Sequence, residues 1–274
     1  MSENLNIAYL GPEATFTHQA AVKAFGEKSG YSPSETIDEI FSMVQDDRAH
    51  RGVAPVENSN EGVVTSTMDL LVDSTLVISG EIILPIRLML LARENDISSV
   101  STVYSHPQAL AQCRKWLKKH LPYCTSMDTK STSEAAYICT QRDRTAAIAG
   151  ELAGELYGLR VLAKDIGDWE ENLTRFLVFS KHPAKQTGND KTSVVFSIKD
   201  RVGALYEMLK PFHENGINLT KIESRPSKKK AWDYLFFIDF EGHCEDEIVK
   251  NTLSSLADLC PFLKVLGSYP VGGK

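Results

Sequence analysis

The sequence predicts an α/β protein in which a part with alternating strands and helices precedes a smaller part of ferredoxin-like topology. Strand and helix patterns alternate through residues 1–181, which is typical of βαβ units and mostly parallel sheets. From residue 191 to residue 274 the order is β-α-β-β-α-β, the ferredoxin-like order. Between the two parts, the Pro, Gly and polar composition of residues 182–190 (HPAKQTGND) predicts a linker.

Short apolar runs and helical periodicities locate the elements of the first part. Strands are expected over residues 6–10, 52–56, 78–91, 102–105, 146–149 and 159–162, and near residue 126. Helices are expected over residues 17–25, 37–48, 62–72, 133–140 and 150–157, and another opens at His106-Pro107, where Pro suits the first turn. A last strand, Phe176-Leu177-Val178-Phe179, is apolar on both faces and should be buried on both sides.

The same reasoning defines the elements of the second part. Strands are expected over residues 192–199, 217–225, 232–240 and 263–269, and helices over residues 203–215 and 245–260. The first of these helices has an apolar stripe at Leu205, Met208, Leu209 and Phe212, which predicts the face that packs on the sheet. The run Lys228-Lys229-Lys230 falls in a hairpin loop and is interpreted as a solvated turn.

Composition limits the classes of protein and of site that the chain can form. The formal net charge is −6 and the one basic run is short, so no nucleic-acid partner is expected. Residues 1–11 lack the features of a secretory signal, and Pro85 and Arg87 interrupt the longest apolar stretch, so no membrane span is expected. The five cysteines are odd in number and form no C-x-x-C pair, which predicts reduced thiols in a cytoplasmic protein without a zinc site.

Four polar clusters stand where strands and helices meet. They contain Thr15, Glu57-Asn58-Ser59, Ser105-His106 with Gln108, and Thr174-Arg175. Each cluster alone has an ordinary explanation as a helix cap, a turn, or an arginine paired with a surface acid. Junctions at the carboxyl ends of strands nevertheless converge on one cleft in an α/β unit. Such a cleft offers hydroxyls, amides and one or two cations, without a metal set or phosphate loop, and suits a small carboxylate-bearing ligand.

Five segments, taken in order, resemble the prephenate dehydratase family. They are GPEATFTHQAA (11–21), PVENSNEG (55–62), YSHPQALAQCRKWL (104–117), STSEAA (131–136) and ENLTRFLVFS (171–180). The segment GALYEMLKPFHENGINLTKIESRP (203–226) resembles the regulatory ACT domain that follows in this family. Departures are small: Ala14 stands where many members have Gly, and Tyr206 where the family often has Val. No helical segment of a chorismate mutase precedes the first strand, so a fused mutase is not expected.

The resemblance implies a bilobed, periplasmic-binding-protein-like catalytic domain over residues 1–181, with the substrate between its lobes. Lobe 1 would comprise about 1–81 and 163–181, lobe 2 about 82–162, and the ACT domain 191–274. The implied activity is conversion of prephenate into phenylpyruvate, carbon dioxide and water, which needs no cofactor and no metal because the ring becomes aromatic. Two alternatives stay open: an arogenate dehydratase, whose substrate has an amino group in place of the keto group, and a non-catalytic small-ligand binding protein.

The family match suggests a role for each polar residue of the cleft. We expect Thr174 to hydrogen-bond the leaving hydroxyl, with Glu57 as an acidic neighbour that polarises it, and Arg175 to clamp a substrate carboxylate. Asn58 completes the expected catalytic set. Further substrate-binding residues are expected at Thr15, Ser59, Ser105, His106, Gln108, Ser131 and Phe176.

The resemblance also implies feedback inhibition by L-phenylalanine, bound where ACT domains pair in a homodimer or homotetramer. A glycine at the start of a helix permits close approach of a ligand, and the helix N-terminus can receive the amino acid's carboxylate. The matching positions are Gly203, Ala204, Leu205, Asn218, Leu219, Glu223, Ser224 and Arg225.

The position of Thr174 and Arg175 conflicts with the rule that ligands bind at the carboxyl ends of parallel strands, because this pair begins its strand. The conflict disappears if the strand runs antiparallel to its neighbours, since its start then lies beside their carboxyl ends. We therefore expect an antiparallel strand here.

Overall fold

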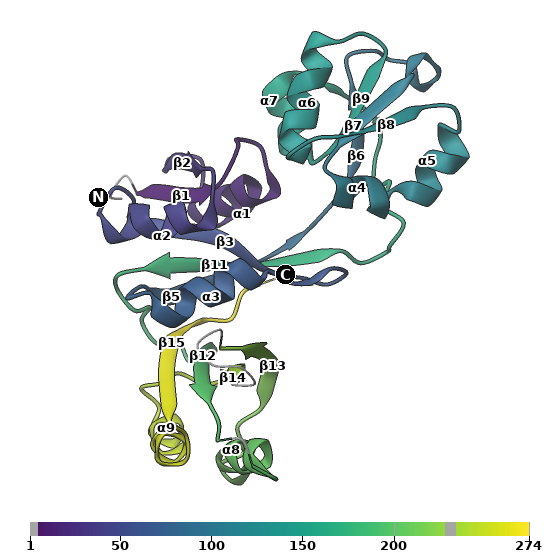
Figure 1. Ribbon diagram of the computed structural model, residues 1–274. Coiled ribbons are helices and arrows are strands. Elements are labelled where there is room, and N and C mark those ends of the chain that lie inside the picture. The colour runs from purple at the N-terminus through teal and green to yellow at the C-terminus, as the bar shows by residue number, and fades with distance from the viewer. Residues whose placement is uncertain (1–4, 200, 228–233, 274) are drawn as a thin grey trace.

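Three β-sheets follow one another along the computed structural model, which describes residues 5–199, 201–227 and 234–273 (Figure 1). We call the first sheet with its helices lobe 1, the second lobe 2 and the third the C-terminal domain. Lobe 1 lies between the other two in Figure 1. The predicted turn at Lys228-Lys229-Lys230 lies outside the described residues.

Lobe 1 is a mixed sheet with helices on both faces. In spatial order its strands are β2 (Gly30–Ser34), β1 (Asn6–Leu10), β3 (Arg51–Asn58), β11 (Leu173–Ser180) and β5 (Val77–Pro85), with β4 (Gly62–Val63) paired to β3. Its helices are α1 (Phe16–Phe25), α2 (Ile37–Gln45) and α3 (Thr65–Asp73). Strand β1 is parallel to β2 and β3, whereas β11 is antiparallel to both β3 and β5. The expected direction of the strand that begins with Thr174 is therefore confirmed.

Lobe 2 is a second mixed sheet. In spatial order its strands are β10 (Arg160–Ala163), β6 (Met89–Ala92), β9 (Thr145–Ala149), β7 (Thr102–Ser105) and β8 (Thr125–Asp128). Its helices are α4 (Pro107–Gln112), α5 (Arg114–His120), α6 (Thr132–Gln141) and α7 (Glu151–Tyr157), with a 3₁₀ turn at Ile97–Ser99. The helix expected to open at His106 is broken at Cys113, which separates α4 from α5.

The chain crosses between the lobes twice, from β5 to β6 through residues 86–88 and back from β10 to β11 through residues 164–172. The strands that lead into and out of these crossings form antiparallel pairs in both sheets. The prediction of mostly parallel sheets is wrong for these strands, because a chain that leaves a lobe and returns to it must run in opposite directions.

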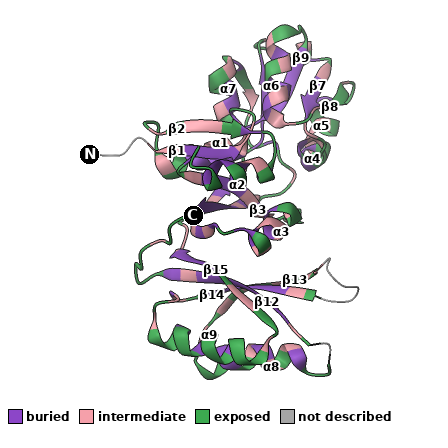
Figure 2. Cartoon of the chain, turned by 60° about the vertical axis from the view of Figure 1, so that its left-hand side comes forward, coloured by how far each residue is buried: buried purple, intermediate pink, exposed green. Residues whose placement is uncertain are grey.

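The C-terminal domain has the predicted β-α-β-β-α-β order. Its elements are β12 (Asp190–Ser197), α8 (Ala204–Glu214), β13 (Leu219–Pro226), β14 (Tyr234–Glu241), α9 (Glu247–Leu259) and β15 (Phe262–Pro270). The sheet order is β13-β14-β12-β15. Figure 2 shows α8 and α9 with exposed surfaces on one side of this sheet, and lobe 1 on the other side.

Lobe 1 and the C-terminal domain share one apolar core. Val195, Phe237 and Leu266 of the third sheet belong to the same buried cluster as Leu71 of α3 and Leu177 of β11. The contact is close, because β15 crosses β5 at a glycine: a Cβ on Gly267 would lie 2.1 Å from the carbonyl oxygen of Ile78. The domain is therefore packed directly on the sheet that carries β3 and β11.

Gly267→Ala is expected to destabilise the junction between lobe 1 and the C-terminal domain. The added methyl group would force β15 away from β5, and the φ of 154° at this position is unfavourable for alanine. Overpacking of this kind lowers the free energy of unfolding by about 1–3 kcal/mol or more, which urea unfolding measures. Gly273→Ala is the control, since a Cβ there meets nothing within 4 Å. Equal stability of the two variants would contradict the close approach.

Candidate active site

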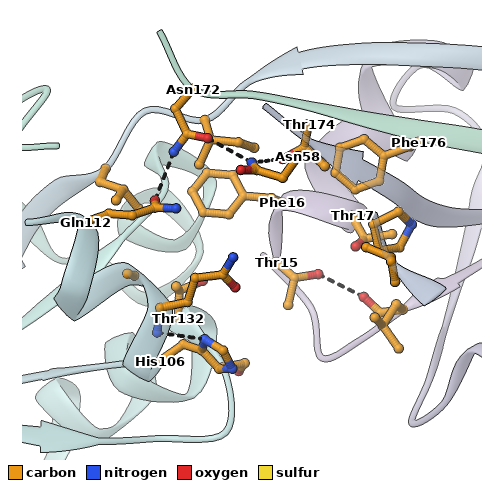
Figure 3. A pocket seen from close by; sticks show the side chains of 18 of the residues that line it. Thr15, Phe16, Thr17, Asn58, His106, Gln112, Thr132, Asn172, Thr174 and Phe176 are labelled. Atoms are coloured by element: carbon orange, nitrogen blue, oxygen red, sulfur yellow. Dashed lines mark hydrogen bonds between the residues drawn. The ribbon is translucent and has the colours of Figure 1, made fainter. Parts of the chain in front are cut away.

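A pocket of about 300 Å³ lies between lobe 1 and lobe 2 (Figure 3). Apolar side chains such as Leu10, Phe16 and Leu88 form part of its wall. The polar residues that line it are Thr15, Thr17, Asn58, His106, Gln108, Gln112, Lys130, Ser131, Thr132, Asn172 and Thr174. Of the residues expected from sequence, it contains Thr15, Asn58, His106, Gln108, Ser131, Thr174 and Phe176.

The pairing of β3 with β11 decides which side chains of these strands face the pocket. The paired residues are, in order, Phe176 with Pro55, Arg175 with Glu57, and Thr174 with Asn58. Val56 is thus an additional residue in β3, a β-bulge that changes the side to which the following residues point. Because paired residues point to the same side of a sheet, Thr174 and Asn58 both face the pocket. Arg175 and Glu57 face the C-terminal domain.

Asn58 holds the hydroxyl group of Thr174 in a fixed direction. Its Oδ1 accepts hydrogen bonds from the backbone N–H groups of Asn60 and Glu61, at 2.9 and 3.1 Å. Its Nδ2 therefore points the other way and donates to Thr174 Oγ1 and to Asn172 Oδ1, both at 2.8 Å (Figure 3). Because Thr174 Oγ1 accepts this hydrogen bond, its own hydrogen is available to a group in the pocket.

A chain of side-chain amides continues from Asn172 into lobe 2. Asn172 Nδ2 donates to Gln112 Oε1 at 2.9 Å, and Gln112 Nε2 donates to Glu61 Oε1 at 3.2 Å. Gln112 lies on α4, so this chain joins the two lobes across the pocket. Gln112 and Asn172 were not among the residues expected from sequence, because neither glutamine in a helix nor asparagine in a loop has a distinguishing local pattern.

Two helices of ten residues begin at the pocket, one in each lobe. Thr15 Oγ1 caps α1 by accepting from the N–H group of His18 at 3.3 Å, and Ser131 Oγ caps α6 by accepting from Glu134 at 3.0 Å. The other N–H groups of these first turns and the helix dipoles favour negative charge. Among the described lining residues, Lys130 has the one permanent positive charge. Lys130 and Thr132 were also missed from sequence.

The remaining uncharged polar residues expected from sequence mainly organise the backbone. His106 caps the short helix α4, where its Nδ1 accepts from the N–H group of Gln108 at 3.3 Å. Ser105 is fully buried, and its Oγ donates to the carbonyl oxygen of Ile148 on the neighbouring strand at 2.6 Å. Ser59 Oγ accepts from the N–H group at position 173, at 3.0 Å. Ser105 and Ser59 do not line the pocket.

Arg175 and Glu57 lie behind the pocket and do not line it. Arg175 donates from Nε to Glu81 at 2.7 Å and from Nη1 to Asp239 of the C-terminal domain at 2.6 Å. Glu57 accepts from Lys221 of the C-terminal domain at 2.7 Å. The expected roles of Arg175 as a carboxylate clamp and of Glu57 as a neighbour of Thr174 have no counterpart in this geometry. Arg175 points away because it alternates with Thr174 along β11, and the β-bulge in β3 turns Glu57 to the same side.

The residues expected to bind an effector lie on α8 and β13 and beside them. Gly203, with φ of 80°, precedes α8, and Asn218 precedes β13, where its Nδ2 donates to Glu241 at 3.0 Å. Arg225 turns toward lobe 1 and donates to the carbonyl oxygen of Thr65 at 2.7 Å. The other positions on the two elements are Ala204, Leu205, Leu219, Glu223 and Ser224.

His18 stabilises the turn that leads into α1. Its Nδ1 accepts a hydrogen bond from the N–H group of Ala14 at 3.0 Å, and its ring stacks on Tyr9 with 4.5 Å between centroids. Ala14 has φ of 59°, a conformation that is unfavourable for a residue with a side chain. Burial lowers the pKa of His18, so the neutral ring can act as the acceptor that keeps Thr15 at the pocket.

Within residues 5–199, 201–227 and 234–273, no three His, Cys, Asp or Glu side chains group as a metal site would need. No helix in these ranges is long and apolar enough to cross a membrane. The five cysteines have free thiols. Burial raises the pKa of Cys113 to about 12 and that of Cys139 to about 11, so these two thiols are unreactive core groups.

Comparisons with known proteins agree over both parts of the chain. The family model "Prephenate dehydratase" matches residues 7–184, and the model "ACT domain" matches residues 192–258. The bifunctional chorismate mutase/prephenate dehydratase of Aquifex aeolicus is 52% identical over 98% of this chain and 75% of its own length. The chloroplastic arogenate dehydratase/prephenate dehydratase 2 of Arabidopsis thaliana is 39% identical over 97% of this chain and 73% of its own. A crystal structure of prephenate dehydratase from Arthrobacter aurescens in complex with L-Phe has a TM-score of 0.90 and 36% identity, and the match covers 97% of this chain and 90% of that one.

The stability of the protein is expected to fall below pH 6.5 through protonation of His18. A lowered pKa in the folded state means that the contribution is complete above the ordinary value of 6.5 and is lost as the pH falls through the folded value. Urea unfolding at several pH values should therefore give a steeper loss for the wild type than for His18→Gln, which keeps an acceptor but does not titrate. His182→Gln, at an exposed position, is the control. Identical pH profiles for wild type and His18→Gln would refute this role.

Proposed function

Because the chain belongs to the prephenate dehydratase family, we propose that it converts prephenate into phenylpyruvate, carbon dioxide and water. The observation that carries this proposal is the Thr174 hydroxyl group, which Asn58 holds at the wall of a pocket between two lobes. The fixed direction of that hydroxyl leaves its hydrogen free for one hydrogen bond to a ligand.

The chemistry of prephenate needs few protein groups. Its cyclohexadiene ring carries two carboxylates, one of them in the pyruvyl side chain, and a hydroxyl group on the opposite carbon. Loss of carbon dioxide leaves an electron pair in the ring, which expels hydroxide and makes the ring aromatic. The hydroxide takes up a proton and becomes water, so no electron acceptor is required. The protein must hold the two carboxylates, stabilise the leaving oxygen and keep bulk water away.

Thr174 is the group that we assign to the leaving oxygen. A hydrogen bond that is strongest when hydroxide charge develops stabilises the transition state more than the substrate. Asn58 supports this role as a positioning residue, because it occupies one acceptor site of Thr174 Oγ1 and so directs the hydroxyl hydrogen. Phe176, two residues along the same strand, contributes apolar wall.

We assign the two substrate carboxylates to the starts of α1 and α6. Thr15 and Ser131 stand at these helix starts, with Lys130 beside the second. One helix belongs to each lobe, so a dianion held by both would favour the closed arrangement of the lobes. The amide chain through Asn172 and Gln112 joins the two lobes at the wall of the same pocket.

Arogenate is the second substrate to be tested, because a relative of 39% identity is named for both dehydratase activities. Arogenate has an ammonium group where prephenate has a keto group, and an ammonium group in a dry pocket calls for a carboxylate partner. The described residues that line this pocket include no Asp or Glu. This supports prephenate as the preferred substrate.

L-Phenylalanine is the effector that we propose for the C-terminal domain. The domain matches the ACT model, and the solved Arthrobacter relative was crystallised with L-Phe. We place the carboxylate of the effector at Gly203 and the start of α8 beside it, because free N–H groups at a helix start favour an anion. Exposed apolar side chains on the same domain, Tyr206, Ile222 and Ile248, support pairing of C-terminal domains between chains of a homo-oligomer.

Thr174→Ala is expected to lower kcat for phenylpyruvate formation from prephenate by roughly 10²–10³-fold, the usual effect of removing one donor to a developing oxyanion. Thr174→Ser is the matched control, because it keeps the hydroxyl and should stay within about tenfold of the wild type. The same assay with arogenate should give a lower kcat/KM. Equal kcat values for Thr174→Ala and Thr174→Ser would show that Thr174 does not act on the leaving oxygen. If the wild type formed product from neither prephenate nor arogenate, the proposed function would be wrong.

A further inference from the structure

Arg175 occupies a closed ring of hydrogen bonds between β11 and the C-terminal domain. Its Nη1 donates to Asp239 Oδ2 at 2.6 Å and its Nη2 to Tyr269 Oη at 2.8 Å. Ser193 Oγ donates to Asp239 Oδ1 at 2.5 Å and lies 2.6 Å from Tyr269 Oη. A carboxylate only accepts, so the Ser193 hydroxyl donates its one hydrogen to Asp239 and must accept a hydrogen bond from Tyr269. The hydrogen bonds of the ring therefore have one defined set of directions. Three of these four residues belong to the C-terminal domain.

The ring belongs to a larger cluster that is neutral as a whole. Its acids and bases come from different strands of lobe 1 and the C-terminal domain, and they are Glu57, Glu81 and Asp239 with Arg175, Lys191 and Lys221. The side chain of Glu81 is completely buried and receives both Arg175 and Lys191. Burial opposes the charge of Arg175, but Tyr269, Asp239 and Glu81 hold its pKa above the ordinary value. Arg175 is therefore charged, and its hydrogen bonds to Glu81, Asp239 and Tyr269 fix its position.

The C-terminal domain is also fastened to both ends of α3, beside this cluster. Arg225 contacts the N-terminal half of α3 through the carbonyl oxygen of Thr65 and through the side chain of Asp69. Lys264 Nζ donates to the carbonyl oxygens of Leu71, Val72 and Ser74 at the last turn. Polar contacts of the domain thus hold lobe 1 at the charged cluster and at both ends of α3. A movement of the domain's sheet would shift β11 through the hydrogen bonds of the Arg175 ring.

The pocket and the ring are one residue apart. Thr174 faces the pocket and Arg175 faces the ring, so a shift of the Arg175 backbone moves the Thr174 hydroxyl by a similar amount. On the other side, Asp239 pairs across strands with Lys221, which lies two residues from Glu223, an expected effector position. A few fixed contacts therefore connect β13, which carries expected effector positions, with the hydroxyl group of Thr174.

We propose that Arg175 is a positioning residue: its hydrogen-bond ring with the C-terminal domain holds β11 so that Thr174 meets the leaving oxygen, and effector binding changes the rate by shifting this ring. The proposal rests on the proposed function, because it concerns how the same pocket is regulated. An effector acts through such a contact only if it binds the two arrangements of the domain with different affinity.

The test removes charge from the ring at a residue that lies outside the pocket. Asp239→Asn keeps the size of the side chain but loses the carboxylate that holds Arg175. We expect kcat with prephenate to fall about tenfold, the effect of misplacing a reacting group, with KM within about twofold of the wild type. The ratio of rates without and with saturating L-phenylalanine should fall toward one, while calorimetry still detects bound L-phenylalanine. Asp258→Asn, the same change at an exposed position of α9, should behave as the wild type.

Tyr269→Phe is the second variant, since it removes only one hydroxyl from the ring and serves if Asp239→Asn does not fold. It should shift kcat and the L-phenylalanine ratio in the same direction by about threefold. A purely structural role would lower the melting temperature but leave both quantities of the folded enzyme equal to those of Asp258→Asn, and that result would overturn the proposal. A wild type that forms no phenylpyruvate removes the proposed function itself. If the wild type is active but its rate does not change with L-phenylalanine, the proposed regulation through the ring is overturned. The kcat values of the variants then decide whether Arg175 positions Thr174.

Discussion

The alternation of side chains along β3 and β11 ties the chemistry of the pocket to the contact with the C-terminal domain. Successive residues of a strand point to opposite faces, so a strand that presents Thr174 to a ligand must present Arg175 to whatever lies behind it. Here that neighbour is the C-terminal domain, which packs directly on lobe 1. Because of the bulge at Val56, β3 presents Asn58 to the pocket and Glu57 to the C-terminal domain, as β11 does with Thr174 and Arg175.

Two kinds of interaction at this junction have different consequences. The apolar core that lobe 1 shares with the C-terminal domain supplies most of the attraction, but it is non-directional. The buried charges add little net stability, because their desolvation offsets their attraction. Removing one partner, however, costs about 3–5 kcal/mol, since a buried charge is left uncompensated. The charged cluster therefore fixes the position of β11 relative to the domain, and in our proposal this position is what an effector changes.

The sequence was sufficient for most of the fold and for part of the site. Strand alternation and apolar stripes reflect local burial, and the place of Thr174 at the start of its strand implied the antiparallel direction of β11. The bulge at Val56 could not be predicted, because it depends on pairing with a strand more than 100 positions away, and it turns Glu57 away from the pocket. Most partners of Arg175 come from another domain and could not be read from the residues beside it, so an arginine next to Thr174 looked like a substrate ligand.

A crystal structure with a non-reacting analogue of prephenate would show whether the two faces of β11 have separate tasks. We predict that Thr174 Oγ1 lies within hydrogen-bond distance of the analogue's hydroxyl group, that the analogue's carboxylates lie at the starts of α1 and α6, and that Arg175 remains on Asp239. An Arg175 guanidinium group that has left Asp239 and binds a carboxylate of the analogue would show that the two faces do not have separate tasks.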